Sequence, residues 1–93
     1  MDNNILKESY NTLSAFYDEY WILMHRKAKS NKSEQRSIET QIDIIRDRVK
    51  HYIEGNPALI EYVEFPDEFF SYQWFDEDFK SLLIRLKDAY EMI

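Results

Sequence analysis

A chain of 93 residues predicts one domain, and because so short a chain buries only about 60 to 65% of its unfolded surface, its core needs large side chains. Fifteen Phe, Tyr and Trp residues supply them, while one Gly and two Pro argue against an all-β fold, which needs turn residues about every 8 to 12 positions. The formal net charge of −6 argues against binding to nucleic acid or anionic membranes, and the absence of Cys excludes disulfides and thiolate metal sites.

The first predicted element is a helix from about residue 4 to residue 29. Its apolar residues recur at alternating steps of four and three, with three more that widen the stripe: Leu6, Tyr10, Leu13, Tyr17, Tyr20 and Met24, then Ile5, Phe16 and Leu23. The apolar arc spans roughly 160°, which is wide enough to pack against two neighbouring helices. A basic run over residues 26–32 suits the negative end of this helix.

A second helix is predicted over about residues 32 to 54, antiparallel to the first. Its apolar stripe follows the same spacing: Ile38, Ile42, Ile45, Val49 and Tyr52. Asn31 is the expected N-cap, with Glu34 three residues further on. Gly55, Asn56 and Pro57 end the helix, and we expect Gly55 to adopt the left-handed conformation there.

A short third helix is predicted over residues 58–64, with Asn56 as its cap and Pro57 in its first turn. A strand is the rival interpretation, because the apolar residues have no clean period there. Residues 67–75 are expected to be irregular or to form a single turn. Asp76 then caps a last helix that ends near residue 92. The predicted fold is all-α: a small helical bundle with a long antiparallel helix hairpin, a short third helix, and a closing C-terminal helix laid against the hairpin groove.

Residues 54–79 combine eight carboxylates and eight aromatic rings with no Lys or Arg. Disordered acidic segments lack such rings, so we expect a folded protein-binding surface, called here the acidic aromatic flank. Its predicted partner-binding residues are Glu61, Tyr62, Glu64, Asp67, Glu68, Tyr72, Trp74, Asp76 and Glu77. Phe65, Phe79 and either Phe69 or Phe70 are expected inside, whereas Tyr62, Tyr72 and Trp74 are the expected exposed anchors.

The flank suggests a non-enzymatic inhibitor that binds a basic protein such as a toxin, a nuclease or a defence complex. The predicted outline is similar to that of small acidic immunity proteins that neutralise nuclease toxins, in architecture and composition alone. The carboxylates could also imitate the phosphates of a nucleic acid. No leader segment or apolar run of about 20 residues is present, so we expect a cytoplasmic protein without a membrane partner.

Two other classes of function stay open. Arg46 and His51 fit the spacing Arg-x4-His, with the polar Asp47 after the Arg, which resembles the ribonuclease motif of HEPN domains and would imply a ribonuclease dimer. Five helical steps place the two side chains about 140° apart, so they would converge only through a kink or across a dimer interface. In the non-catalytic alternative, Arg46 flanks the apolar stripe of its helix and His51 is exposed to solvent.

The third possibility is a structural subunit of a larger complex or a homodimer. Ile22, Ile44 and Ile84 fall off the apolar arcs of their helices, and they would mark a self-association patch if they converged. We expect no cofactor, metal or catalytic residue: His25 and His51 lack ligands at helical spacing, and no nucleophile motif or glycine-rich phosphate loop is present.

Overall fold

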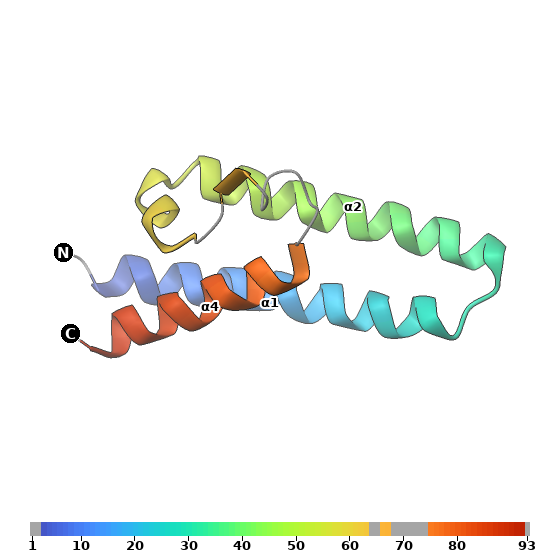
Figure 1. The fold of residues 1–93 in the computed structure, drawn as a ribbon, viewed down its shortest axis with the longest axis horizontal. Helices are drawn as coiled ribbons and strands as arrows, with labels where there is room; N and C mark the ends of the chain where they lie inside the picture. Colours follow the sequence, from blue (N-terminus) through green and yellow to red (C-terminus); the bar gives the residue numbers. More distant parts are fainter. Residues whose placement is uncertain (1–2, 64–65, 68–74, 93) are drawn as a thin grey trace.

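The computed structural model describes residues 3–63, 66–67 and 75–92, and all regular secondary structure in these ranges is helical (Figure 1). The elements are helix α1 (Asn3–Ala28), helix α2 (Lys32–Glu54), the 3-10 helix η1 (Pro57–Tyr62) and helix α4 (Phe75–Glu91). The predicted all-α bundle is therefore confirmed. The bounds of the long helices lie within one residue of the predicted ones.

The three long helices form an elongated bundle. Helices α1 and α2 make an antiparallel hairpin, and α4 runs back along the N-terminal half of α1, so both chain ends lie at one end of the molecule (Figure 1). Helix α1 packs against both α2 and α4, as the width of its apolar arc predicts. Residues 21–45 extend beyond α4 as a two-helix arm, which explains overall dimensions of 47 × 23 × 19 Å.

Aromatic pairs fix α4 against α1. The ring centroids lie 5.5 Å apart for Tyr10 and Tyr90, 5.0 Å apart for Tyr17 and Phe79, and 5.3 Å apart for Tyr20 and Phe75. The pairs follow each other along both helices in opposite directions, which sets the antiparallel register. Phe79 is buried, as predicted, whereas Phe65, Phe69 and Phe70 lie outside the described residues.

The hairpin turn agrees with the predicted cap, but the end of α2 does not agree with the predicted glycine conformation. The Glu34 N–H donates to Asn31 Oδ1 at 2.9 Å, which confirms the N-cap. Gly55 has φ −76°, so the expected left-handed conformation is wrong. Its N–H continues the helical pattern by bonding His51 O, and Asn56 Nδ2 bonds Tyr52 O at 2.8 Å. The carbonyl groups of His51 and Tyr52 at the end of α2 thus accept hydrogen bonds without a residue in the left-handed conformation.

The third element is helical and not a strand, but it is a 3-10 helix that ends at Tyr62, two residues before the predicted end. Pro57 occupies its first turn as expected. Asn56 makes no side-chain cap for it, so that part of the prediction is wrong; its Nδ2 donates to Tyr52 O of α2.

The start of the last helix also differs from the prediction. Helix α4 begins at Phe75, so Asp76 lies in its first turn and is not the cap. Of the segment expected to be irregular or a single turn, Asp67 is helical together with Pro66, while residues 68–74 lie outside the described part of the chain.

Candidate functional site

Five of the nine residues predicted for the acidic aromatic flank can be placed. Glu61, Asp67 and Glu77 are exposed, and Tyr62 and Asp76 are half-buried. The other four, Glu64, Glu68, Tyr72 and Trp74, lie outside the described residues. The placed carboxylates come from η1, from the helical residues 66–67 and from the first turn of α4. These elements all lie over the half of the molecule away from the hairpin tip (Figure 1).

The short helix η1 is held by two apolar residues. Leu59 is fully buried and Val63 is nearly so, and η1 packs against α2 and α4. Glu61 lies between them in sequence and faces solvent. The packing of Leu59 and Val63 in the core therefore determines which way the Glu61 carboxylate points.

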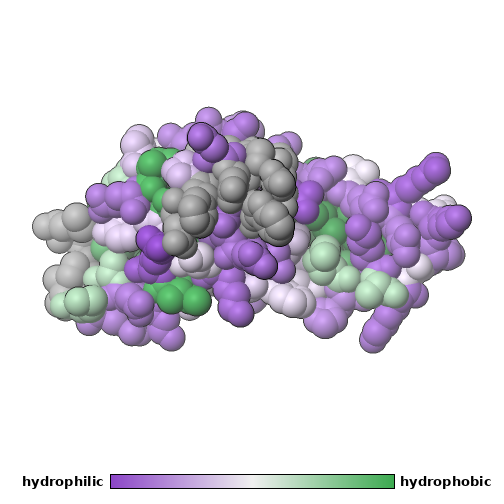
Figure 2. All heavy atoms as spheres, in the orientation of Figure 1, coloured by the Kyte–Doolittle hydropathy of each residue, from purple (hydrophilic) through white to green (hydrophobic). Residues whose placement is uncertain are grey.

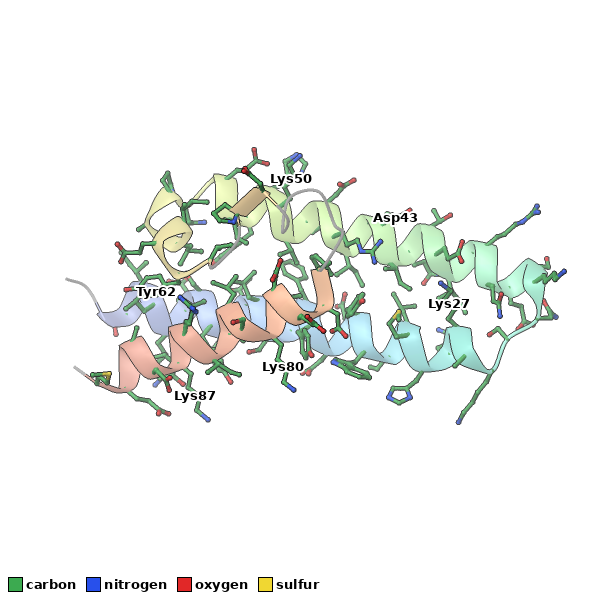
Figure 3. The ribbon with its side chains drawn as sticks, viewed as in Figure 1. Lys27, Asp43, Lys50, Tyr62, Lys80 and Lys87 are labelled. Carbon is green, nitrogen blue, oxygen red and sulfur yellow. The ribbon has the colours of Figure 1, made fainter. Side chains whose placement is uncertain are left out.

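Tyr62 is less available than an exposed anchor would be. Its ring packs against the hydrophobic core, pointing from η1 toward the helices (Figure 3). Loss of hydration raises the pKa of its hydroxyl above 10, and the hydrogen bond to Glu61 and that residue's charge raise it further. Tyr62 thus contributes to the fold as well as to the flank surface.

The three acids in the first turn of α4 have different environments. Glu77 is exposed, Asp76 is half-buried and Asp78 is buried, with 9% of its surface exposed. A helix N-terminus favours negative charge, which makes the first turn a suitable place for all three. Burial of Asp78 was not foreseen from the sequence, which indicated only an acidic first turn.

Arg46 lies beside this acidic first turn and is a residue whose role the sequence did not reveal. Its guanidinium carbon is 5.4 Å from the centre of the Phe75 ring, and its Nη1 is 3.3 Å from Asp43 Oδ1. It also affects Tyr20: burial and the charge of Asp76 raise the pKa of the Tyr20 hydroxyl, whereas Arg46 lowers it in part. Arg46 therefore joins α2 to the start of α4 through its cation–π contact with Phe75, while its ion pair with Asp43 lies within α2.

The buried Tyr20 predicts a loss of stability at alkaline pH. Its folded-state pKa is raised above 10, so the unfolded chain releases the proton first. The stabilisation that the neutral Tyr20 provides is complete below about pH 10. It is lost as the pH rises through 10 toward the raised pKa of the folded state. Urea unfolding between pH 8 and 11.5 should show this decline, and Tyr20→Phe should make it shallower. Equal slopes for the two proteins would contradict the assignment.

Arg46 and His51 do not converge within one chain. Arg46 lines a cavity of about 240 Å³ whose other charged residues are Lys27, Glu39 and Asp43. His51 is exposed, its Nδ1 lies 2.7 Å from Asp47 O, and it lines a different groove with Phe16. The helix is continuous from 32 to 54, so the 140° separation expected of a regular helix applies.

Positive charge gathers at the opposite end of the molecule. Arg26, Lys29, Lys32 and Arg36 are exposed around the hairpin tip, where hydrophilic side chains dominate the surface (Figure 2). Lys80 and Lys87 of α4 point away from η1 and α2 (Figure 3). The exposed basic residues of the hairpin tip are therefore separated along the molecule from the placed carboxylates of the flank, whereas Arg46 lies beside the first turn of α4.

No group of three or more His, Cys, Asp or Glu side chains in the described ranges is arranged to hold a metal ion. No described helix combines the length and apolarity needed to cross a membrane.

Comparison with models of known protein families, with curated proteins and with solved structures gave no match for this chain in any of the three.

Proposed function

We propose that this protein is a non-enzymatic binding protein that inhibits or neutralises a basic partner protein through its acidic aromatic flank. The observation that supports this most is the placement of Glu61, Asp67 and Glu77. All three are exposed, and they come from three elements over one half of the molecule. Immunity, antitoxin and anti-defence proteins are the functional classes that this proposal includes.

Charge asymmetry supports the choice of partner. Residues 54–93 carry ten Asp and Glu against three Lys and Arg, whereas the hairpin tip is basic. A cationic protein would be attracted to the acidic half and repelled by the tip, so the field would orient the encounter as well as accelerate it. The same negative field disfavours the binding of nucleic acid at the flank. We therefore propose neither a nucleic acid nor a membrane as a direct partner.

Aromatic residues would supply the energy that holds the complex. Tyr and Trp are enriched among the residues that dominate binding energies at protein interfaces, because they bury a large area with few rotatable bonds. Tyr62 is half-buried and presents part of its ring beside Glu61. Tyr72 and Trp74 enter this proposal from their sequence alone.

A binding role is preferred to a ribonuclease role because Arg46 and His51 open onto different surfaces of the chain. Arg46 is also engaged with Phe75 and Asp43, which accounts for its presence without catalysis. The proposal therefore needs no cofactor. We propose that the two proteins meet in the cytoplasm, because a chain without Cys fits a reducing compartment.

Reversal of the flank's charges should abolish capture of the partner. The immobilised chain is mixed with nuclease-treated host extract, in parallel with the triple variant Glu61→Lys, Asp67→Lys and Glu77→Lys. Wild type should retain a basic protein that the variant loses, with an affinity at least roughly tenfold weaker, or about 1.4 kcal/mol.

The matched control reverses three exposed acids elsewhere: Glu8→Lys, Asp18→Lys and Glu34→Lys. This control carries the same total charge as the flank variant, so it separates the position of the charges from their sum. It should capture the partner nearly as well as wild type. Equal capture by the flank variant and wild type would contradict the proposed function.

A further inference from the structure

A continuous groove runs between α1 and α2 on the side of the hairpin that α4 does not cover. It consists of two adjoining cavities of about 370 and 480 Å³, which share Ile44 and Arg48. Among the described residues, none from α4 lines either cavity. Phe16 and Glu19 of the α1 wall lie about 100° and 160° around the helix from Tyr17, which packs on α4.

The groove has an apolar floor and two exposed isoleucines. Leu23 and Ile45 are buried beneath it, while Ile22 and Ile44 are 59% and 46% exposed on opposite walls. Two of the three isoleucines that lie outside the main apolar arcs of their helices therefore line the same cavity. The third, Ile84, is 53% exposed on α4 and lines neither cavity. A single exposed isoleucine is ordinary, but a facing pair above an apolar floor is typical of an interface core.

The charged residues of the groove are complementary to each other. Glu19 lies on the α1 wall and Arg48 on the α2 wall, and neither forms an ion pair with any residue that the structure describes. The cavity of about 370 Å³ thus carries an apolar pair together with one acid and one base, while Asp47 lines the adjoining cavity. Such a surface can match a second copy of itself, because a two-fold interface uses the same surface twice.

We propose that this groove is the interface of a homodimer whose two-fold axis runs parallel to the hairpin. Such an axis places α1 of one copy on α2 of the other, so that Glu19 faces Arg48 and Ile22 faces Ile44. An axis lying across the helices would instead place α1 on α1 and bring the two Glu19 carboxylates together. None of the described residues of the acidic aromatic flank lines either cavity, so each copy keeps Glu61, Asp67 and Glu77 free.

Two single charge reversals test the contact between copies directly. In Glu19→Arg, both symmetry-related contacts become Arg against Arg48, and in Arg48→Glu both become Glu against Glu19. Each variant alone should dimerise at least roughly tenfold more weakly than wild type. An equimolar mixture should form a heterodimer, because both contacts are attractive again. The wild-type charge of −6 leaves both variants net negative, so overall attraction would not produce this pairing.

Sedimentation between about 1 and 100 µM gives the dimerisation constants, and native mass spectrometry identifies the heterodimer by mass. Ile44→Asp should reduce dimerisation, whereas Ile84→Asp, the same change at an isoleucine that is also about half exposed, should not. Circular dichroism checks that the variants stay helical. A wild type that is monomeric throughout, as it would be if the groove received a helix of another protein, would overturn the proposal. So would single variants that dimerise normally or a mixture that fails to pair.

Discussion

Replacing Phe79 with alanine is expected to lower the free energy of unfolding by about 3 to 5 kcal/mol. The ring is completely buried, and its centroid lies 5.0 Å from that of Tyr17 and 5.2 Å from that of Phe75. Alanine would leave a cavity where α4 meets α1 and would remove the central pair of the three that set the register. Because the total stability of a small domain is about 5 to 15 kcal/mol, this loss is about a fifth of the stability or more.

Urea unfolding followed by circular dichroism measures this change. Ile84→Ala is the control on the same helix, and its exposed position predicts a change within about 0.5 kcal/mol. Phe79→Leu should fall between the two, because it retains most of the apolar volume. A loss below about 1 kcal/mol for Phe79→Ala would show that α4 does not pack on α1 as the structure has it.

Leu59→Ala is the second substitution with a large expected effect, about 2 to 5 kcal/mol. Leu59 is fully buried, and it joins η1 to a core that includes Ile53 of α2 and Phe79 of α4. Removing it should loosen the element that orients Glu61 and Tyr62. The substitution should therefore weaken partner binding as well as the fold.

Thermal or urea unfolding of Leu59→Ala, compared with that of Glu61→Gln, separates the contribution of η1 to the fold from its contribution to the charge of the flank. Glu61 is exposed on the same short helix, so its substitution should leave stability within about 0.5 kcal/mol while reducing the charge of the flank. If Leu59→Ala unfolds at the same denaturant concentration as wild type, η1 is not held by the core.

The long helices could be predicted because their apolar residues repeat over many turns. Steps of three and four place Leu6, Leu13 and Tyr20 on one face of α1, and all three are buried. The cap at Asn31 was also predictable, since the bond from the Glu34 N–H needs only local geometry. In both cases the signal lies within a few residues of the structure that it determines.

Helix ends near residue 55 were less predictable, because several local hydrogen bonds compete there. Asn56 could cap the following helix or the preceding one, and its amide bonds the Tyr52 carbonyl of α2. With that carbonyl satisfied, Gly55 continues the right-handed turn, and its glycine-specific conformation is not used. Sequence spacing alone did not rank these bonds against each other.

Contacts between distant segments were beyond sequence reasoning. The meeting of Arg46 with Phe75 depends on where α4 begins along the hairpin, and the buried Asp78 depends on the same register. The convergence of Ile22 with Ile44 likewise depends on the register of α1 against α2. A helical period shows which residues share a face of one helix, but it does not place one helix along another.

The most direct test of the proposed function is the association rate of the captured basic partner with this protein as ionic strength is varied. Stopped-flow mixing at about 20 to 500 mM salt should show a rate that falls at least roughly tenfold, because salt screens charges beyond a Debye length. The triple flank variant should associate slowly and with little dependence on salt. A wild-type rate that stays constant across this range, with the complex still forming, would contradict the proposal that the acidic aromatic flank directs binding.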